Sequence, residues 1–343
     1  MAAGPGERMQ PLSFDKQKHV LKILGKSILE HTLDQLDGLV NEVIIVIRKT
    51  KSCNAIKKLI GKRYKNLKII YAYQKRALGT GDAVQAALPF LNSRVLLMNG
   101  DDLYVNKDIK RVLNNFPCVL VKKVKQPQFF GIIGIKGNKV VSLVEKPSKP
   151  KSDLANAGMY YFPTDIFKTK INKTKRGEYE VVDYLKKLIK KGNLGYVRAS
   201  RWTPVSYPWS LLEIVKGKKY IGKNCKINCD LGNSVDIGDD TIINNAKVNN
   251  SIIGKNCKIE NCTLKNSIIG DYCKINGATI KTTNGSTIFT EVKGKMIDTK
   301  RKGFGVVMAD RSILNPGCTI YPGVKIWPKK VIKKGQIIKK DVR

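Results

Sequence analysis

The chain has 343 residues, of which 42% are hydrophobic, and it carries a formal net charge of +37. A chain of this length can bury more than one core, so we expect two domains. No apolar run approaches the roughly 20 residues that a transmembrane helix needs, and the N-terminus lacks the apolar region of a signal peptide. The sequence thus excludes a helical membrane protein and predicts a cytoplasmic one without a membrane partner.

The positive charge is spread along the whole chain. Residues 1–219 carry 42 basic and 17 acidic side chains, and residues 220–343 carry 22 and 10. Nucleic-acid-binding proteins gather Lys and Arg on one face, because clustered cations neutralise phosphates. The even excess favours a solvated basic surface that attracts anionic substrates over a specific nucleic-acid groove, which stays open as an alternative.

The first part of the chain alternates between strand and helix patterns. The pair Ser27 and Glu30 forms a capping box before apolar residues at helical spacing, which predicts a helix over 27–36. Short β-branched runs then lie at residues 43–47, 68–73 and 94–99. Runs separated by amphipathic stretches indicate βαβ units. We predict an α/β domain over 1–219 with a Rossmann-like mixed, mostly parallel sheet.

An internal repeat follows Tyr220. Apolar residues recur every six positions, and Ile-Gly pairs recur every sixteen, at 221/222, 237/238, 253/254 and 269/270. Three six-residue units make a triangular coil of roughly eighteen residues, so a step of sixteen implies one shortened corner. A β-sandwich would not keep so regular a step. We predict a left-handed parallel β-helix over 220–343, which favours a homo-oligomer such as a trimer.

The eight cysteines are expected to pack rather than bind metal. The sequence has no pair of CxxC units, and no histidine follows His31. Cys225, Cys257 and Cys273 occupy the same position of the repeat, where a small apolar side chain would stack inside the coils.

The opening run AAGPGERMQPL, residues 2–12, has the composition of a phosphate-binding loop. Glycines let backbone N–H groups approach phosphate oxygens, and Arg8 offers a planar fork of donors. A glycine-rich loop by itself is often only a turn.

Several further motifs follow the loop in a fixed order. They are Lys18, LGTG at 78–81, Gly100-Asp101, EKP at 145–147 and NAG at 156–158. With the opening loop they resemble the nucleotidyltransferase family that activates sugar-1-phosphates, over most of residues 2–215. The segments 207–213, 292–305 and 320–328 resemble the long archaeal forms, which pair this enzyme with a β-helical acetyltransferase domain.

The resemblance implies a role for each matching residue. The backbone of Ala3, Gly4 and Gly6 would cradle a nucleoside triphosphate, and Arg8 and Lys18 would neutralise its charge. Gln74, Gly79 and Thr80 match positions that read the base. Gly131, Glu145 and Asn156 match positions that bind sugar hydroxyls, and Lys146 would hold the sugar's phosphate. Asp101 would bind Mg²⁺, because a hard cation needs carboxylate oxygen at a strand tip.

Some of these residues also have a simpler interpretation. A Gly-Asp pair after a strand is commonly a turn, most lysines of so basic a chain are solvated, and Gln74 could only cap a strand. The implied reaction joins a sugar-1-phosphate, as nucleophile, to the α-phosphorus of the triphosphate and releases pyrophosphate. Positioning and charge neutralisation would suffice, so no general base is required.

The sequence departs from the family at two places that bear on the fold and the metal. The family has a buried strand before the glycine-rich loop, which here follows Met1 directly, and we expect the sheet to suffer. The family also has an acidic residue three positions before the YPW tyrosine, where this chain has Pro204. Proline cannot bind Mg²⁺, so Asp101 would hold the ion with water and phosphate.

Acetyl transfer is not expected from the second domain. Glu260 aligns near the expected catalytic histidine, and both histidines of the chain precede residue 32. Three hypotheses remain for the chain. They are an active nucleotidyltransferase using UTP or dTTP with N-acetylglucosamine-1-phosphate or glucose-1-phosphate, a degenerate homologue that binds sugar nucleotides without turnover, and a basic nucleic-acid-associated protein.

Overall fold

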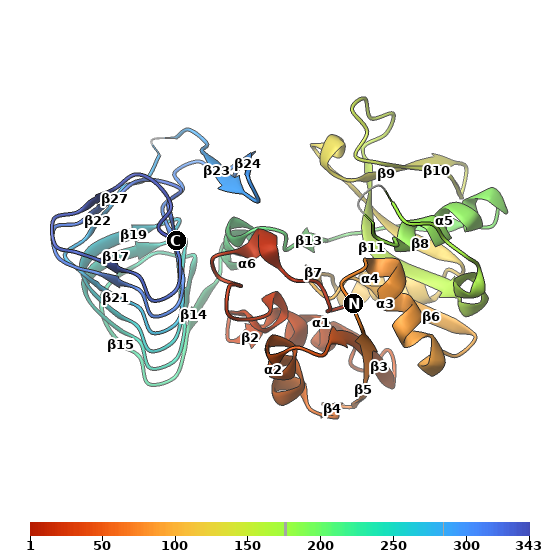
Figure 1. Cartoon of the computed structure of the whole chain (residues 1–343), viewed down its shortest axis with the longest axis horizontal. Helices are drawn as coiled ribbons and strands as arrows, with labels where there is room; N and C mark the ends of the chain where they lie inside the picture. The colour runs from red at the N-terminus through yellow and green to blue at the C-terminus, as the bar shows by residue number, and fades with distance from the viewer. Residues whose placement is uncertain (175–176, 284) are drawn as a thin grey trace. The chain divides into compact units, whose positions relative to one another are not determined.

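The computed structural model describes residues 1–174, 177–283 and 285–343 (Figure 1). Contacts between residues divide the chain into two compact units. The first unit combines Met1–Pro5 with Leu29–Pro204, and the second combines Gly6–Ile28 with Val205–Arg343. No described helix is long and apolar enough to span a membrane. The chain therefore passes from the first unit to the second between Pro5 and Gly6, within the opening loop. The domain boundary at residue 219 stays a prediction.

The first unit begins with a small sheet in the order β3-β5-β4, with β3 (Glu42–Arg48) parallel to β5 (Leu67–Gln74) and β4 (Arg63–Tyr64) at its edge. Helix α1 (Ile28–Leu36) precedes it, and α2 (Lys51–Ile60) connects its parallel strands. The threonine before α2 caps it, since Thr50 accepts the Cys53 N–H at 3.3 Å. The predicted helix over 27–36 and the strands at 43–47 and 68–73 are confirmed.

A six-stranded sheet forms the rest of the first unit. Its order is β6 (Arg94–Met98), β11 (Leu154–Pro163), β8 (Cys118–Lys123), β12 (Gly195–Arg198), β10 (Lys139–Glu145) and β9 (Gly131–Lys136). The mixed α/β class is confirmed, but among the described pairs of this sheet only β8–β12 is parallel. After residue 115 the strands β8 to β11 follow one another without an α-helix between them, and such short connections produce antiparallel pairs.

Helices α4 (Asn106–Leu113) and α5 (Val181–Lys190) pack against this sheet. Helix α3 (Thr80–Ala87) packs mainly on β3 and β5 and adds Val84 to the core beside α5. Tyr184 and Leu185 of α5 pack with Phe162 and Phe167, and all four are almost fully buried. Short 3₁₀ turns lie at Leu88–Phe90, Pro127–Phe129 and Thr164–Lys168.

Met1 and Ala2 join the two sheets of the first unit. The Ala2 N–H donates to Val46 of β3, the Met1 amino group donates to Met98 of β6, and the Gly100 N–H donates to Met1. A mainly apolar cavity of about 320 Å³ lies beside them, lined by residues of both strands. Burial lowers the pKa of the amino group to about 6, against the opposing effect of Asp101. Strands β3 and β6 are thus bridged by two residues, with open space beyond them.

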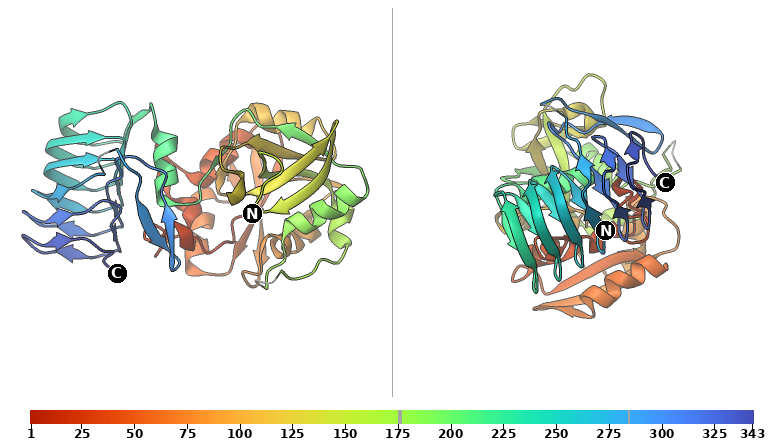
Figure 2. Two further views of the ribbon diagram at one scale, coloured as in Figure 1. Left: turned by 90° about the horizontal axis from the view of Figure 1, so that it is seen from above. Right: turned by 90° about the vertical axis from the view of Figure 1, so that its left-hand side faces the viewer.

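The second unit contains stacked parallel strands that form the predicted β-helix, seen edge-on in Figure 2. One face is β14 (Lys219–Ile221), β16 (Val235–Ile237), β18 (Ser251–Ile253), β20 (Ile268–Ile269), β25 (Val307–Met308) and β28 (Lys325–Ile326). A second face is β15 (Lys226–Leu231), β17 (Ile242–Asn249), β19 (Lys258–Lys265), β21 (Lys274–Asn276), β26 (Ile313–Leu314) and β29 (Val331–Ile332). A third face is β22 (Thr279–Ile280), β27 (Thr319–Ile320) and β30 (Ile337–Ile338).

The register of the coils explains the sequence repeat. Val235 pairs with Ser251, a step of sixteen, whereas Val307 pairs with Lys325, a step of eighteen. Gly254 needs its small size, because a Cβ there would lie 2.6 Å from the Gly270 carbonyl carbon of the next coil. A hairpin of β23 (Phe289–Val292) and β24 (Lys295–Asp298) interrupts the repeat between β22 and β25.

The repeated cysteines pack inside the coils, as predicted. Cys257 and Cys273 are buried, and their thiols donate to the carbonyls of Gly270 and Ala309 at 3.1 and 3.2 Å. Cys225 is half-buried and makes the equivalent bond to Gly238. All eight cysteines are free thiols.

The segment Gly6–Ile28 belongs to the second unit. It contains two 3₁₀ turns, Glu7–Met9 and Lys18–Val20, and the short antiparallel strands β1 (Lys22–Ile23) and β2 (Lys26–Ser27). The 3₁₀ turn Pro208–Ser210 and helix α6 (Leu211–Val215) lie in the same unit before the coils begin.

Candidate functional site

Asp101 and Asp102 follow β6, and the structure distinguishes them. Asp101 is half-buried, whereas Asp102 is 6% exposed. The Asp102 carboxylate accepts the indole N–H of Trp202 and the amide N–H of Asn99, both at 3.2 Å. Asp102 holds two neighbouring side chains, and Asp101, which is less buried, is the more accessible of the two carboxylates for a metal ion.

Pro204 lies directly beside this acidic pair. Strand β7 (Asp102–Leu103) pairs with β13 (Thr203–Pro204), and the register sets Pro204 opposite Asp102. Opposed residues of an antiparallel pair project to the same face. The described residues contain no group of three or more His, Cys, Asp or Glu side chains suited to a metal. The position where the resemblance leads one to expect a second acidic ligand thus lies opposite Asp102, the residue after the metal candidate, but it holds a proline.

Three of the four residues predicted to bind the sugar lie together. Gly131 begins β9 and pairs with Glu145 at the end of β10. A Cβ on Gly131 would lie 2.8 Å from the Glu145 carboxylate and 3.7 Å from Asn156 Cβ. An added Cβ would therefore displace the end of the Glu145 side chain. The strands thus bring Gly131, Glu145 and Asn156 to one place.

Lys146 lies at the edge of this group. Its φ of +45° is left-handed, and its N–H donates to Phe130 at 3.0 Å. The exposed ammonium lies 3.9 Å from the Glu145 carboxylate. An exposed cation on a constrained backbone, beside the sugar candidates, suits the binding of a phosphate group.

The NAG motif packs tightly against the end of β6. Gly158 has φ +69°, and a Cβ there would lie 2.1 Å from the Asn99 side-chain nitrogen. The Gly158 carbonyl accepts the Asn99 N–H at 3.0 Å, and Asn156 accepts the Gly158 N–H at 3.1 Å. This close approach explains the glycine and ties the sugar candidates to the strand that precedes Asp101.

Tyr160 and Trp202 are site residues that the sequence analysis missed. The Asn156 amide donates to the Tyr160 hydroxyl at 2.9 Å. Burial raises the pKa of Tyr160 above its usual range, and the charges of Asp102 and Glu145 add to this effect. Tyr160 had the pattern of an ordinary buried strand residue. Trp202 packs edge-on to Phe130 at 5.5 Å, and no motif marked it.

The residues predicted to read the base also lie together. Gln74 ends β5, is buried, and donates through its amide to Gly79 O at 3.0 Å and to Asp82 at 2.9 Å. Gly79 has φ +97°, and a Cβ there would lie 2.3 Å from the Tyr179 carbonyl. The Thr80 hydroxyl accepts the Val181 N–H at 3.0 Å. The LGTG turn is therefore fixed by residues around 179–181, which the sequence did not connect to it.

The opening loop is divided between the two units. In the first unit Ala3 is buried, and its carbonyl accepts the Arg48 Nε–H at 2.8 Å. Gly4 is exposed, with nothing within 4 Å of an added Cβ. In the second unit Gly6 has φ +71°, and its carbonyl accepts the N–H of Met9 and the hydroxyl of Ser13.

The two predicted cations differ in their surroundings within the second unit. Arg8 is exposed and lies over the ring of Tyr207 at 5.8 Å, and Tyr207 in turn stacks on Trp209 at 4.8 Å. Lys18 is 6% exposed and donates to the Val205 carbonyl at 2.7 Å. The YPW segment thus supports Arg8, and Lys18 is held inside the unit.

The β-helix position predicted to replace an acetyltransferase histidine is also described. Glu260 lies on β19, half-buried, with its carboxylate 3.1 Å from the Lys258 ammonium. An ion-paired carboxylate is already neutralised, so the contact gives no support to a general base here.

Comparison with known proteins identifies the relatives of this chain. Residues 1–219 match the Nucleotidyl transferase family. The bifunctional protein GlmU of Methanocaldococcus jannaschii is 34% identical over 242 residues, which cover 69% of this chain and 56% of that protein. A bifunctional sugar-1-phosphate nucleotidylyltransferase/acetyltransferase of Sulfurisphaera tokodaii is 28% identical over 242 residues, covering 69% of this chain and 58% of that protein.

Solved structures give a concordant result. A candidate glucose-1-phosphate thymidylyltransferase of Bacillus anthracis, crystallised in complex with sucrose, has a TM-score of 0.57 and 25% identity. The match covers 62% of this chain and 90% of that one. The chain spans little more than half the length of the first two relatives. Because the family match covers residues 1–219, well over half of the sequence, the chain belongs to the nucleotidyl transferase family.

Proposed function

We propose that this protein transfers a nucleotidyl group from a nucleoside triphosphate to a sugar-1-phosphate and releases pyrophosphate. The observation that carries the proposal is the meeting of Gly131, Glu145 and Asn156 at the ends of β9, β10 and β11. These residues come from three successive strands, and Glu145 and Asn156 belong to two different motifs. A carboxylate, an amide and a bare glycine surface together suit a sugar ring with several hydroxyls.

The triphosphate would be bound by the opening loop together with Arg8 and Lys18. The backbone of Ala3, Gly4 and Gly6 would donate N–H groups to phosphate oxygens. Arg8, supported by Tyr207, and Lys18 would neutralise the charge that develops as pyrophosphate leaves.

Magnesium fits the residues beside β6. Asp101 supplies a hard oxygen ligand and is more exposed than the neighbouring carboxylate of Asp102. With Pro204 opposite, we infer that Asp101 is the main protein ligand and that phosphate and water complete the coordination. The ion would neutralise phosphate charge when bound.

The chemical step needs orientation more than proton transfer. A phosphate oxygen of the sugar-1-phosphate attacks the α-phosphorus, and the bond from that phosphorus to the bridging oxygen of pyrophosphate breaks. Lys146 would hold the attacking phosphate, while Glu145 and Asn156 would fix the ring to which it is attached. The attacking phosphate is already anionic at neutral pH, so no side chain has to remove a proton.

We propose UTP or dTTP as the nucleotide, with N-acetylglucosamine-1-phosphate or glucose-1-phosphate as the acceptor. Buried Gln74, in contact with Gly79, suits recognition of a pyrimidine edge by an amide and backbone groups. The relatives' names support a sugar-1-phosphate. The β-helix would serve assembly, with a trimer as one form, rather than acetyl transfer, and we expect the protein to be cytoplasmic.

A second candidate function is the binding of sugar nucleotides without turnover. The proline opposite Asp102 favours it, because a lone carboxylate holds Mg²⁺ less tightly than two. Such a protein would keep the sugar and base contacts and lose only the metal-dependent step.

Pyrophosphate release separates these candidates. The full chain would be incubated with Mg²⁺, with UTP, dTTP or GTP, and with glucose-, N-acetylglucosamine- or mannose-1-phosphate. We expect release with a pyrimidine triphosphate, and a fall of about 10²- to 10³-fold for Asp101→Ala. Asp165→Ala is the matched control, since Asp165 is exposed and pairs only locally with Lys168. Absence of release from every pair would refute the enzyme, and tight binding of a UDP-sugar in that case would support the second candidate.

A further inference from the structure

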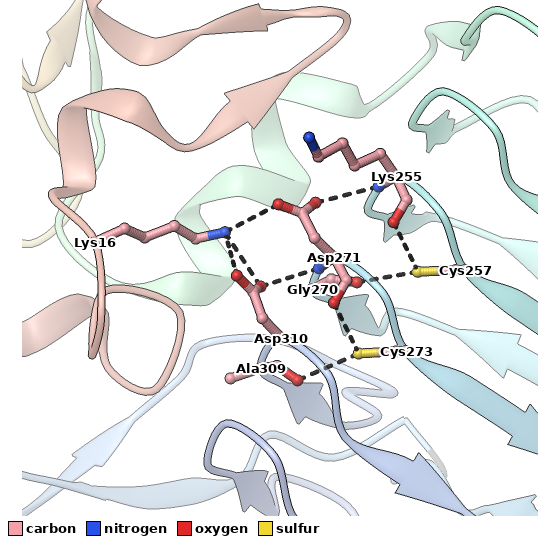
Figure 3. A network of polar contacts seen from close by, with 8 residues as sticks. All are labelled: Lys16, Lys255, Cys257, Gly270, Asp271, Cys273, Ala309 and Asp310. Atoms are coloured by element: carbon pink, nitrogen blue, oxygen red, sulfur yellow. Dashed lines mark hydrogen bonds and ion pairs between the residues drawn. The ribbon is translucent and has the colours of Figure 1, made fainter. Parts of the chain in front are cut away.

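The segment Gly6–Ile28, which carries Arg8 and Lys18, is anchored to the β-helix by a partly buried ion triad. Lys16 lies between Asp271 and Asp310, with its ammonium 3.2 Å from the first carboxylate and 2.8 Å from the second (Figure 3). The three side chains are between 25% and 30% exposed. Burial lowers the pKa of Lys16, but the two carboxylates outweigh it, so the net pKa is raised.

The two carboxylates are held rigidly by the coils. Asp310 accepts the backbone N–H of Asp271 at 2.9 Å, and Asp271 accepts the N–H of Lys255 at 3.1 Å. Stacked like charges repel each other unless a cation lies between them. Lys16 supplies that cation, and the contact therefore stabilises both the coil and the loop.

The sequence of the coils makes this place distinctive. The residue after the stacked glycine or alanine is Lys223, Asp239, Lys255, Asp271 and Asp310 in successive coils. Among these coils, acidic residues stand next to each other only at Asp271 and Asp310. That is where Lys16 binds, so the loop docks at a specific point of an otherwise repetitive surface.

Other contacts pin the same segment on both sides of Lys16. The Leu24 N–H donates to the Asp236 carboxylate at 2.7 Å, and Glu7 pairs with Lys293 in the hairpin turn. Tyr220 packs over Gly25, where an added Cβ would lie 2.5 Å from the ring. The loop is thus held by coils well separated in sequence.

We infer that the β-helix positions the segment Gly6–Ile28. Asp271 and Asp310 act through Lys16 as positioning residues for nucleotidyl transfer. The inference rests on the proposed function of Arg8 and Lys18. Preorganised cations stabilise a developing charge without reorganising during the reaction, so a loosened loop loses part of that stabilisation. The β-helix then contributes to nucleotidyl transfer without having an active site of its own.

The test compares Lys16→Met, the pair Asp271→Asn with Asp310→Asn, and all three substitutions together. We expect KM for the triphosphate to rise about tenfold in each, with KM for the sugar-1-phosphate unchanged. The triple variant should be no worse than either parent, because both remove the same contact. Hydrogen exchange of residues 6–28 should accelerate in all three. Asp239→Asn is the control, since its carboxylate accepts the Lys223 N–H at the equivalent coil position.

The outcomes separate this inference from the proposed function. An inactive wild-type chain refutes the proposed function and the positioning role that depends on it. An active wild type whose variants keep the triphosphate KM overturns the positioning role alone, even if exchange accelerates. Additive effects, or exchange that stays as in the wild type, would overturn the anchoring of the loop by Lys16.

Discussion

Pro204 lies directly opposite Asp102 in the β7–β13 pair, with the Asp102 carboxylate already bonded to Trp202 and Asn99. A side chain at position 204 projects to the same face as that of Asp102. The position at which the sequence departs from its family therefore lies opposite a residue of the candidate metal site. If the proposed reaction depends on a metal ion, one substitution at position 204 should change that dependence.

Pro204→Asp should strengthen Mg²⁺ binding. A carboxylate at position 204, opposite the residue that follows Asp101, is expected to add an oxygen ligand. We expect the Mg²⁺ concentration for half-maximal pyrophosphate release to fall about tenfold, or about 1.4 kcal/mol. Pro204→Asn, which adds a neutral side chain of similar size, is the control. An equal response of both variants would show that the backbone change, rather than the charge, is responsible.

Gly131→Ala should weaken binding of the sugar-1-phosphate. The new Cβ would lie 2.8 Å from the Glu145 carboxylate and must displace it. We expect KM for the sugar-1-phosphate to rise about tenfold or more, with KM for the triphosphate little changed. Gly137→Asn is the control in the same hairpin, since φ there is +57° with nothing within 4 Å, and asparagine tolerates that conformation. An unchanged sugar KM in Gly131→Ala would contradict the assignment.

Gly158→Ala should destabilise the fold. Alanine is strained at φ +69°, and its Cβ would lie 2.1 Å from the Asn99 amide. We expect the free energy of unfolding to fall by at least about 2 kcal/mol, measured by urea unfolding. Gly192→Ala, with φ +65° and nothing within 4 Å, isolates the backbone strain. The two variants should differ, and equal losses would mean that the Asn99 contact contributes nothing.

Asp236 should make stability depend on pH. Burial raises the pKa of its carboxyl from 3.8 to about 7, against the bond from the Leu24 N–H. The folded protein then holds a proton that the unfolded chain releases above about pH 4. Stability contributed by this group is therefore present at low pH and lost as pH rises to about 7, an effect of at most about 4 kcal/mol. Asp236→Asn should flatten the unfolding free energy between pH 4 and 7, and an unchanged slope would reject the assignment.

Local patterns were enough to predict much of this fold. The helix at 28–36 and the strands β3, β5 and β6 follow from periodicity and capping, because these act over a few neighbouring residues. The β-helix follows from the repeat for the same reason, since each coil stacks only on its neighbours. The antiparallel pairing of β8 to β11 was missed, because connections without helices leave no periodic signal.

The sequence by itself determined which chemical groups the site can use, because the motifs name Asp101, Glu145 and Asn156 one by one. Only the tertiary structure decided how they are supported, by Tyr160, Trp202 and the tight approach of Gly158 to Asn99. It also decided that Lys16 binds between Asp271 and Asp310, some 250 residues or more away along the chain. Periodicity encodes contacts between near neighbours, whereas these contacts depend on how the distant segments pack, and no local pattern specifies that packing.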